Sequence, residues 1–217
     1  MKQSLLIAAA AAAFLTAASA SGASPARRAT GVLYNQNSNF GYTVDSQNFE
    51  SSYAQYDSVA ADDFFVPAGK TWHITEVDVT GAYVDGSGPA SSVVVILWKG
   101  NGTPRRIAGR GTYSWTINCT DNAGSFACTL PNNSRGKPPQ LKGGAYGTDY
   151  WLTVVANCSF SGGCGYWEWT TDTTIHGSSG IWKNPSNGWG TGCEGWGSFS
   201  SCFGEPDADL AFDLVGY

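Results

Sequence analysis

Aromatic and amide side chains gather in one stretch near the carboxyl end of the chain, WKNPSNGWGTGCEGWGSFSSC, which runs from Trp182 to Cys202. Flat indole rings beside amides and carboxylates suit a sugar, because the rings stack on a pyranose face while the polar groups bind its hydroxyls. The same composition also suits a covering loop, in which glycines let the backbone approach a sheet end and the indoles are buried. The candidate ligand-binding residues are Trp182, Asn184, Asn187, Trp189, Glu194 and Trp196.

Carboxylates form a second group of residues that could bind a metal ion or take part in catalysis. The candidates are Asp62, Asp63, Asp207 and Asp209. Calcium takes carboxylate and backbone oxygens from irregular loops, so these acids predict a structural calcium site, and calcium is the one cofactor that the sequence suggests. Alternatively, the acids cap strands and turns, or keep sheet edges from pairing. A glycosidase pair is less favoured, because no sequence signal places a second carboxylate across a cleft.

The chain has only two histidines, His73 and His176. His176 follows a threonine-rich segment and could be assisted by Asp172 in a hydrolase, since catalytic triads assemble from distant positions. However, the sequence has no G-x-S-x-G motif, and every cysteine has an expected disulfide partner. We therefore predict no catalytic residue, and a secreted hydrolase that uses His176 is the least favoured hypothesis.

Six cysteines fall into three local pairs, spaced nine, six and nine residues apart. The even count in an exported chain predicts three disulfides. A zinc site is the alternative, but the C-x2-C spacing typical of zinc ligands is absent. The predicted bonds are Cys119–Cys128, Cys158–Cys164 and Cys193–Cys202.

The amino-terminal end predicts export. A lysine, an apolar run and the small-residue sequence ASA make residues 1–20 a signal peptide, because the apolar run is too short for a membrane span. Residues 21–30 are expected to form a flexible lead, and no later stretch predicts a membrane span. Removal of Lys2 changes the net charge from -5 to -6, which disfavours a nucleic-acid partner. The expected location is extracellular or periplasmic.

The segments between the turn signals predict strands and almost no helix. Residues 148–158 alternate, with Trp151, Thr153 and Val155 on one side, and residues 93–98 suggest a strand buried on both faces. The apolar phase slips between Ile74 and Val77, which predicts a β-bulge. About eight strands without βαβ alternation indicate an all-β fold. We predict a single domain over residues 31–217, an antiparallel two-sheet sandwich of jelly-roll type with long disulfide-held loops.

Several segments in order resemble a known family. They are ADDFFVPAGKTWHITEVDVTGAYVDGSGPASSVVVILWKGNGTP (Ala61 to Pro104), YWLTVVAN, YWEWTT, WKNPSNGWGTGCEGW and PDADLAFDLVG. This pattern is similar to an uncharacterised family of secreted bacterial β-sandwich domains, found alone or attached to exported proteins such as subtilisin-like peptidases. The resemblance covers most of the mature chain and implies the fold and the compartment. The family has no established activity.

The function that the sequence favours is a non-catalytic, secreted binding or accessory module. Its expected partner is a polysaccharide or a cell-surface glycan, because the aromatic loop is the most informative feature of the chain. The alternative is a structural or adhesive surface protein that contacts other proteins through sheet edges and loops.

Overall fold

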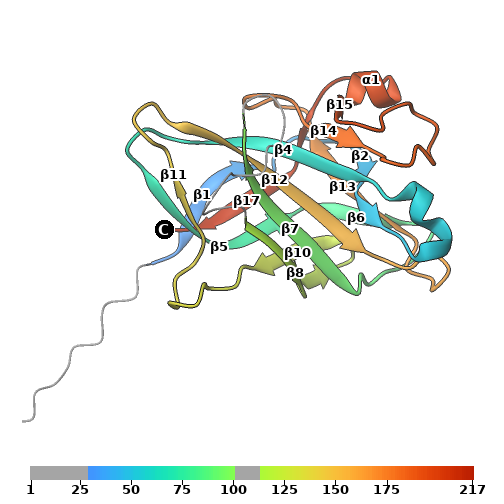
Figure 1. Cartoon of the computed structure of the whole chain (residues 1–217), viewed down its shortest axis with the longest axis horizontal. Coiled ribbons are helices and arrows are strands. Elements are labelled where there is room, and N and C mark those ends of the chain that lie inside the picture. Colours follow the sequence, from blue (N-terminus) through green and yellow to red (C-terminus); the bar gives the residue numbers. More distant parts are fainter. Residues whose placement is uncertain (1–28, 101–112) are drawn as a thin grey trace, which may run out of the picture.

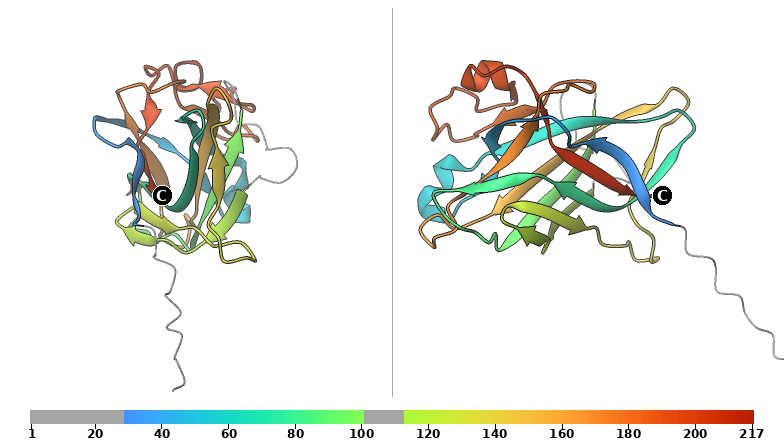
Figure 2. Two further views of the ribbon diagram at one scale, coloured as in Figure 1. Left: turned by 90° about the vertical axis from the view of Figure 1, so that its left-hand side faces the viewer. Right: turned by 180° about the vertical axis from the view of Figure 1, so that it is seen from behind.

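The computed structural model describes residues 29–100 and 113–217. The expected signal peptide, and residues 21–28 of the expected lead, lie outside the described residues. The described chain folds into strands that form two facing layers, with two short helices, η1 (Ser51–Tyr56) and α1 (Phe199–Phe203), at one end (Figures 1 and 2). None of the described helices is long and apolar enough to cross a membrane.

One layer is a single hydrogen-bonded sheet, here called the front sheet. In spatial order it contains β15 (Gly197–Ser198), β14 (Ile181–Lys183), β4 (Val59–Val66), β12 (Thr148–Asn157), β7 (Ser92–Lys99) and β8 (Tyr113–Ile117). All of these pairs are antiparallel, and the short β3 (Gln47–Asn48) adds a parallel pair at the end of β12.

The other layer, here called the back layer, consists of two sheets. The first contains β1 (Gly31–Gln36), β17 (Phe212–Gly216), β5 (Thr71–Val79), β10 (Ser125–Thr129) and β9 (Thr120–Asn122), with β11 (Gln140–Lys142) beside β5. The second contains β16 (Asp209–Leu210), β13 (Tyr166–Asp172) and β2 (Phe40–Asp45), with β6 (Gly81–Val84) beside β13. Backbone hydrogen bonds at Thr80, Thr170 and Ala211 join the two sheets, because β5 continues into β6 and β16 continues into β17.

The core lies between the layers and follows the strand alternation. Tyr150, Leu152 and Val154 of β12 point into it, as do Trp167 and Trp169 of β13. The β12 residues that alternate with Tyr150, Leu152 and Val154 are buried as well, because other side chains cover the outer face of the front sheet there. The prediction of an all-β antiparallel sandwich is confirmed, and so are the two sides of β12.

The predicted irregularity in the strand over residues 71–79 is also confirmed. Val215 pairs with Glu76 and Gly216 pairs with Ile74, so β5 carries one extra residue, Thr75, in a bulge. The prediction for β7 was wrong, since its apolar residues alternate between buried and partly exposed. The reason is that its alternate side chains lie on the outer face of the front sheet, which is less completely covered over β7 than over β12.

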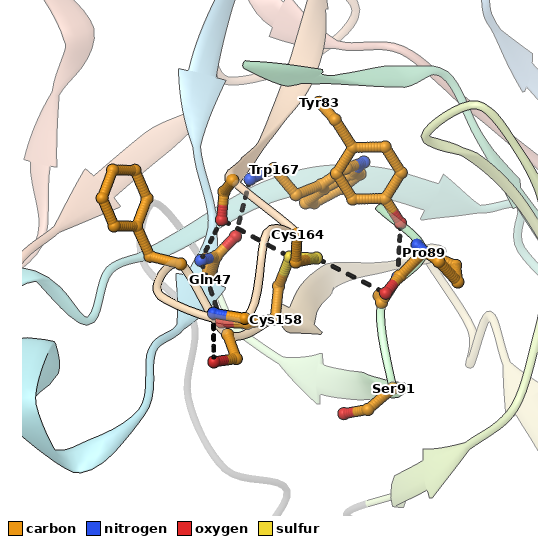
Figure 3. The surroundings of a disulfide bond; sticks show 12 residues. Gln47, Tyr83, Pro89, Ser91, Cys158, Cys164 and Trp167 are labelled. Carbon is orange, nitrogen blue, oxygen red and sulfur yellow. Dashed lines mark hydrogen bonds between the residues drawn. A yellow bond between two sulfur atoms is a disulfide. The ribbon is translucent and has the colours of Figure 1, made fainter. Parts of the chain in front are cut away.

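All three predicted disulfides are present, and each one closes a local loop. Figure 3 shows how the second is built into the fold. The fully buried Gln47 donates from Nε2 to the carbonyls of Cys158 and Gly165, both at 3.2 Å, and its Oε1 accepts from Trp167 N at 2.6 Å. The side-chain amide of Gln47 thus links the second disulfide loop to the start of β13, and these hydrogen bonds hold the loop and the strand together.

Candidate functional site

The outer face of β2 and β13 carries a hollow with a convergent set of polar groups. We call it the aromatic groove. It has a volume of about 590 Å³, within the roughly 300–1,000 Å³ typical of ligand pockets. It is lined by Gly41, Tyr42, Thr43, Val44, Asp45, Tyr166, Glu168, Trp182, Trp189, Thr191, Phe203 and Glu205.

Strand alternation explains why polar and aromatic side chains meet on this face. Trp167 and Trp169 of β13 point into the core, so Tyr166 and Glu168 point outward. Glu168 lies directly opposite Asp45 of β2 in the antiparallel register. Directly opposed residues have Cβ atoms about 4.5–5.5 Å apart, so the floor of the groove holds a pair of neighbouring carboxyl groups.

The two carboxyl groups have different environments. Asp45 is only 9% exposed, and its Oδ2 accepts a hydrogen bond from the Ser58 hydroxyl. Its Oδ1 has no hydrogen-bond partner among the described residues. Burial raises the pKa of Asp45 well above its usual value, the Ser58 hydrogen bond opposes this, and the charge of Glu168 adds to it. Glu168 is partly exposed and accepts a hydrogen bond from Thr43.

A wall of the groove is formed by the loop between β14 and α1, which lies with α1 at the same end of the molecule as η1 (Figures 1 and 2). Trp182, at the base of this loop, is 1% exposed; its Nε1 donates to Asp45 O at 2.7 Å, and its ring contacts Phe203. Asn184 is fully buried, and its Nδ2 donates to Gln55 O and Asp57 O, both at 2.8 Å. Both residues therefore hold the loop against the domain.

Trp189 differs from the other loop tryptophans because it is 39% exposed at the groove. Three rings surround it, Phe49, Tyr56 and Tyr166, with centroids 5.1–6.4 Å away. Its Nε1 donates to Tyr56 O at 2.8 Å, and its backbone N–H donates to Asn184 Oδ1 at 3.0 Å. The exposed indole is thus held in one orientation.

The other predicted ligand residues lie outside the groove lining. Asn187 shapes the loop, with φ of 50° and its Oδ1 accepting from Gly192 N at 2.9 Å. Glu194 is exposed, and Trp196 packs on the outer face of the front sheet, with Lys183 Nζ 4.6 Å from its ring centroid. Trp182 and Trp189 thus both line the groove, but only Trp189 is exposed there, and Trp196 lies on another face, so the three form no common exposed row.

A second hollow adjoins the groove and shares Tyr166 and Trp189 with it. We call it the side hollow, and its volume is about 340 Å³. Its other lining residues come from the η1 region, the turn after β6 and the second disulfide loop: Phe49, Tyr53, Tyr56, Asp85 and Phe160. The two hollows together form a continuous aromatic surface with Trp189 at its centre.

The four candidate calcium ligands do not lie together. Asp62, Asp63 and Asp209 are buried near the crossing of β4 and β16, and backbone N–H groups already donate to all three carboxyl groups. Burial raises the pKa of each, and raises that of Asp63 to about 6. Asp207 lies apart and accepts from Ser200 N in α1. Within residues 29–100 and 113–217, no group of three or more His, Cys, Asp or Glu side chains is placed to hold a metal ion, and the calcium site stays a prediction.

His176 lies beside this acidic cluster. Its Nδ1 is 3.5 Å from Asp209 Oδ2, and its backbone N–H donates to the same oxygen at 2.5 Å. Asp172, the partner expected from the sequence, instead accepts hydrogen bonds from Ser38, Asn39 and Thr174. In the described part of the chain, no serine, threonine or cysteine side chain is hydrogen-bonded to this imidazole.

Sequence reasoning missed most of the groove lining. It missed Tyr42, Asp45, Tyr166, Glu168, Phe203 and Glu205. The available signal was the alternation in YWEWTT, which places Tyr166 and Glu168 on the side opposite the two buried tryptophans. That signal does not reveal that β2 supplies a carboxyl group next to Glu168, because strand register follows from the tertiary fold.

Comparison with known proteins gives one distant likeness. No protein-family model and no curated protein matches the chain. Among solved structures, the chain is similar to the cysteine protease and lectin-like domains of Cwp84, a surface layer associated protein of Clostridium difficile. The identity is 10% and the TM-score 0.45, and the match covers 73% of this chain and 31% of that one. The chain thus spans about a third of that neighbour, and a likeness of this degree carries no functional inference.

Proposed function

We propose that this protein is a secreted, non-catalytic module that binds glycans at the aromatic groove. The groove combines the two features that sugar recognition requires: aromatic rings for stacking on a pyranose face, and polar groups that bind hydroxyls. Tyr166, Glu168 and Trp189 converge there from a rigid strand and from a loop held by the third disulfide.

The observation that carries the proposal is the state of Trp189. Single exposed aromatic side chains are common on protein surfaces, whereas several aromatic rings gathered in one hollow indicate an interaction site. Trp189 is exposed although three rings and two hydrogen bonds fix its position. A ring that is already ordered loses little conformational entropy when a ligand stacks on it, so the arrangement favours binding.

The experiment is a binding screen against soluble polysaccharides, read by tryptophan fluorescence and by gel retardation. We expect Trp189→Ala to abolish binding of the polysaccharides that the unchanged protein retains. Tyr146→Ala is the matched control, because Tyr146 is a 94% exposed aromatic that lines neither hollow. If no polysaccharide binds, or if binding survives Trp189→Ala with the fold intact, the proposal is refuted.

Export and the absence of catalysis belong to the same proposal. Three disulfides fit an oxidising compartment, as does the predicted signal peptide. The resemblance to secreted bacterial β-sandwich domains stays a prediction. Activity on any ester, peptide or glycoside substrate that is lost in His176→Ala would instead favour the hydrolase hypothesis.

A further inference from the structure

We propose that the ligand of the aromatic groove and side hollow is a glycan that carries free amino groups, such as a polymer of deacetylated hexosamine. This inference rests on the proposed function and specifies the chemical class of its ligand. It is carried by the joint composition of the two hollows, in which acidic and aromatic side chains occur together without any basic group.

The charge of the lining has one sign. Four acidic residues line the two hollows: Asp45, Asp85, Glu168 and Glu205. The negative charge is assigned to the last three, because burial raises the pKa of Asp45 well above its usual value. No lysine, arginine or histidine is among the described lining residues. A surface of one charge sign attracts ligands of the opposite charge and disfavours acidic ones, so this lining selects against sulfated or uronic-acid polysaccharides.

The aromatic lining favours the same ligand. A cation over the face of a tyrosine or tryptophan, within about 6 Å of the centroid, is attracted by the ring quadrupole. Trp189 and Tyr166 stand between the two hollows, so a glycan that crosses both would pass an ammonium group along their rings. An amino sugar therefore uses the stacking surface and the carboxylates together, whereas a neutral sugar uses chiefly the stacking surface.

The floor of the groove supplies an acceptor for the amino group. Glu168 accepts from Thr43 through Oε2, and this hydrogen bond orients the carboxylate and leaves Oε1 for a ligand. The opposing Asp45 is about nine-tenths buried, and its Oδ1, which has no hydrogen-bond partner among the described residues, lies beneath the groove floor, so this oxygen is not presented to the ligand. A ligand ammonium has three donors, and Glu168 Oε1 can accept one of them in a charge-assisted hydrogen bond.

The test compares two oligosaccharides of equal length, a glucosamine oligomer and its fully N-acetylated counterpart. Binding is measured by calorimetry at a pH of about 6, below the ordinary pKa of an amine. We expect the glucosamine oligomer to bind about tenfold more tightly or better, because hydrogen bonds to charged groups are the stronger ones. Glu168→Gln and Glu205→Gln should each remove most of this preference.

Glu194→Gln is the matched control, since it removes the same charge from an exposed loop position outside both hollows. It should leave the preference unchanged. The inference is overturned if the acetylated oligomer binds equally well, if the glutamine variants in the groove keep the preference, or if a lysine oligomer binds as tightly as the glucosamine oligomer. If neutral glycans bind and Trp189→Ala abolishes that binding, the proposed function stands although the inference about amino groups fails. If no glycan binds at all, the proposed function and the inference are both refuted.

Discussion

Two tryptophans of the same loop should respond very differently to truncation. Trp182 is 1% exposed and Trp189 is 39% exposed. Truncation of a fully buried tryptophan costs about 3–5 kcal/mol. Trp182→Ala also leaves the buried carbonyl of Asp45 without its donor, which adds about 1 kcal/mol or more. The expected loss for Trp182→Ala is therefore about 4–6 kcal/mol.

The corresponding loss for Trp189→Ala is smaller, because only about three-fifths of the side chain is buried and the carbonyl it frees, that of Tyr56, lies near solvent. Scaling the buried-residue cost gives about 2–3 kcal/mol. For a domain of this size, 1 kcal/mol corresponds to about 2–4 °C in Tm. We thus expect Tm to fall by about 10–20 °C in Trp182→Ala and by about 5–10 °C in Trp189→Ala.

The assay is thermal and urea unfolding of both variants, followed by circular dichroism under non-reducing conditions. Trp182→Phe is a useful control, because it keeps a ring against Phe203 but removes the indole N–H. Its Tm should lie between that of the unchanged protein and that of Trp182→Ala. Equal melting temperatures for Trp182→Ala and Trp189→Ala would refute the assignment of Trp182 as a structural residue and Trp189 as a binding residue.

Three further outcomes follow from the structure. Replacement of Cys193 and Cys202 by serine opens a loop with a sequence separation of nine, so urea unfolding should show a loss of about 2–3 kcal/mol, together with weaker glycan binding. Burial raises the pKa of Asp63 and Asp78 from 3.8 to about 6, so the folded state binds protons more tightly than the unfolded state; the stabilisation is complete below pH 3.8, and the free energy of unfolding should fall as the pH rises toward about 6. A urea series showing stability that is flat or rising over that window would contradict this assignment. If a structural calcium ion is bound, a chelator should lower Tm, and an unchanged melting curve removes that hypothesis.

Local chemistry made much of the fold predictable. Strand alternation fixed the two sides of residues 148–157, and a phase slip between Ile74 and Val77 located the bulge. Cysteine spacing gave all three disulfides, because short loops bring their ends together at little entropic cost. Each of these features depends on residues that are close in the chain.

The functional surface was less predictable, since composition does not tell which face of a loop is covered. The sequence placed Trp182, Trp189 and Trp196 in one candidate site. The tertiary structure buries Trp182, exposes Trp189 at the groove, and packs Trp196 on the outer face of the front sheet.

The sequence by itself determined the sandwich class, the two sides of β12 and the disulfide pairs, because these follow from backbone periodicity and local spacing. Only the tertiary structure decided that Asp45 of β2 lies opposite Glu168 of β13, 123 positions further along the chain, in the same hollow as Trp189. The physical reason is strand register. A shift of one residue would turn every side chain of β2 to the other face, and the register is set by packing of the whole core.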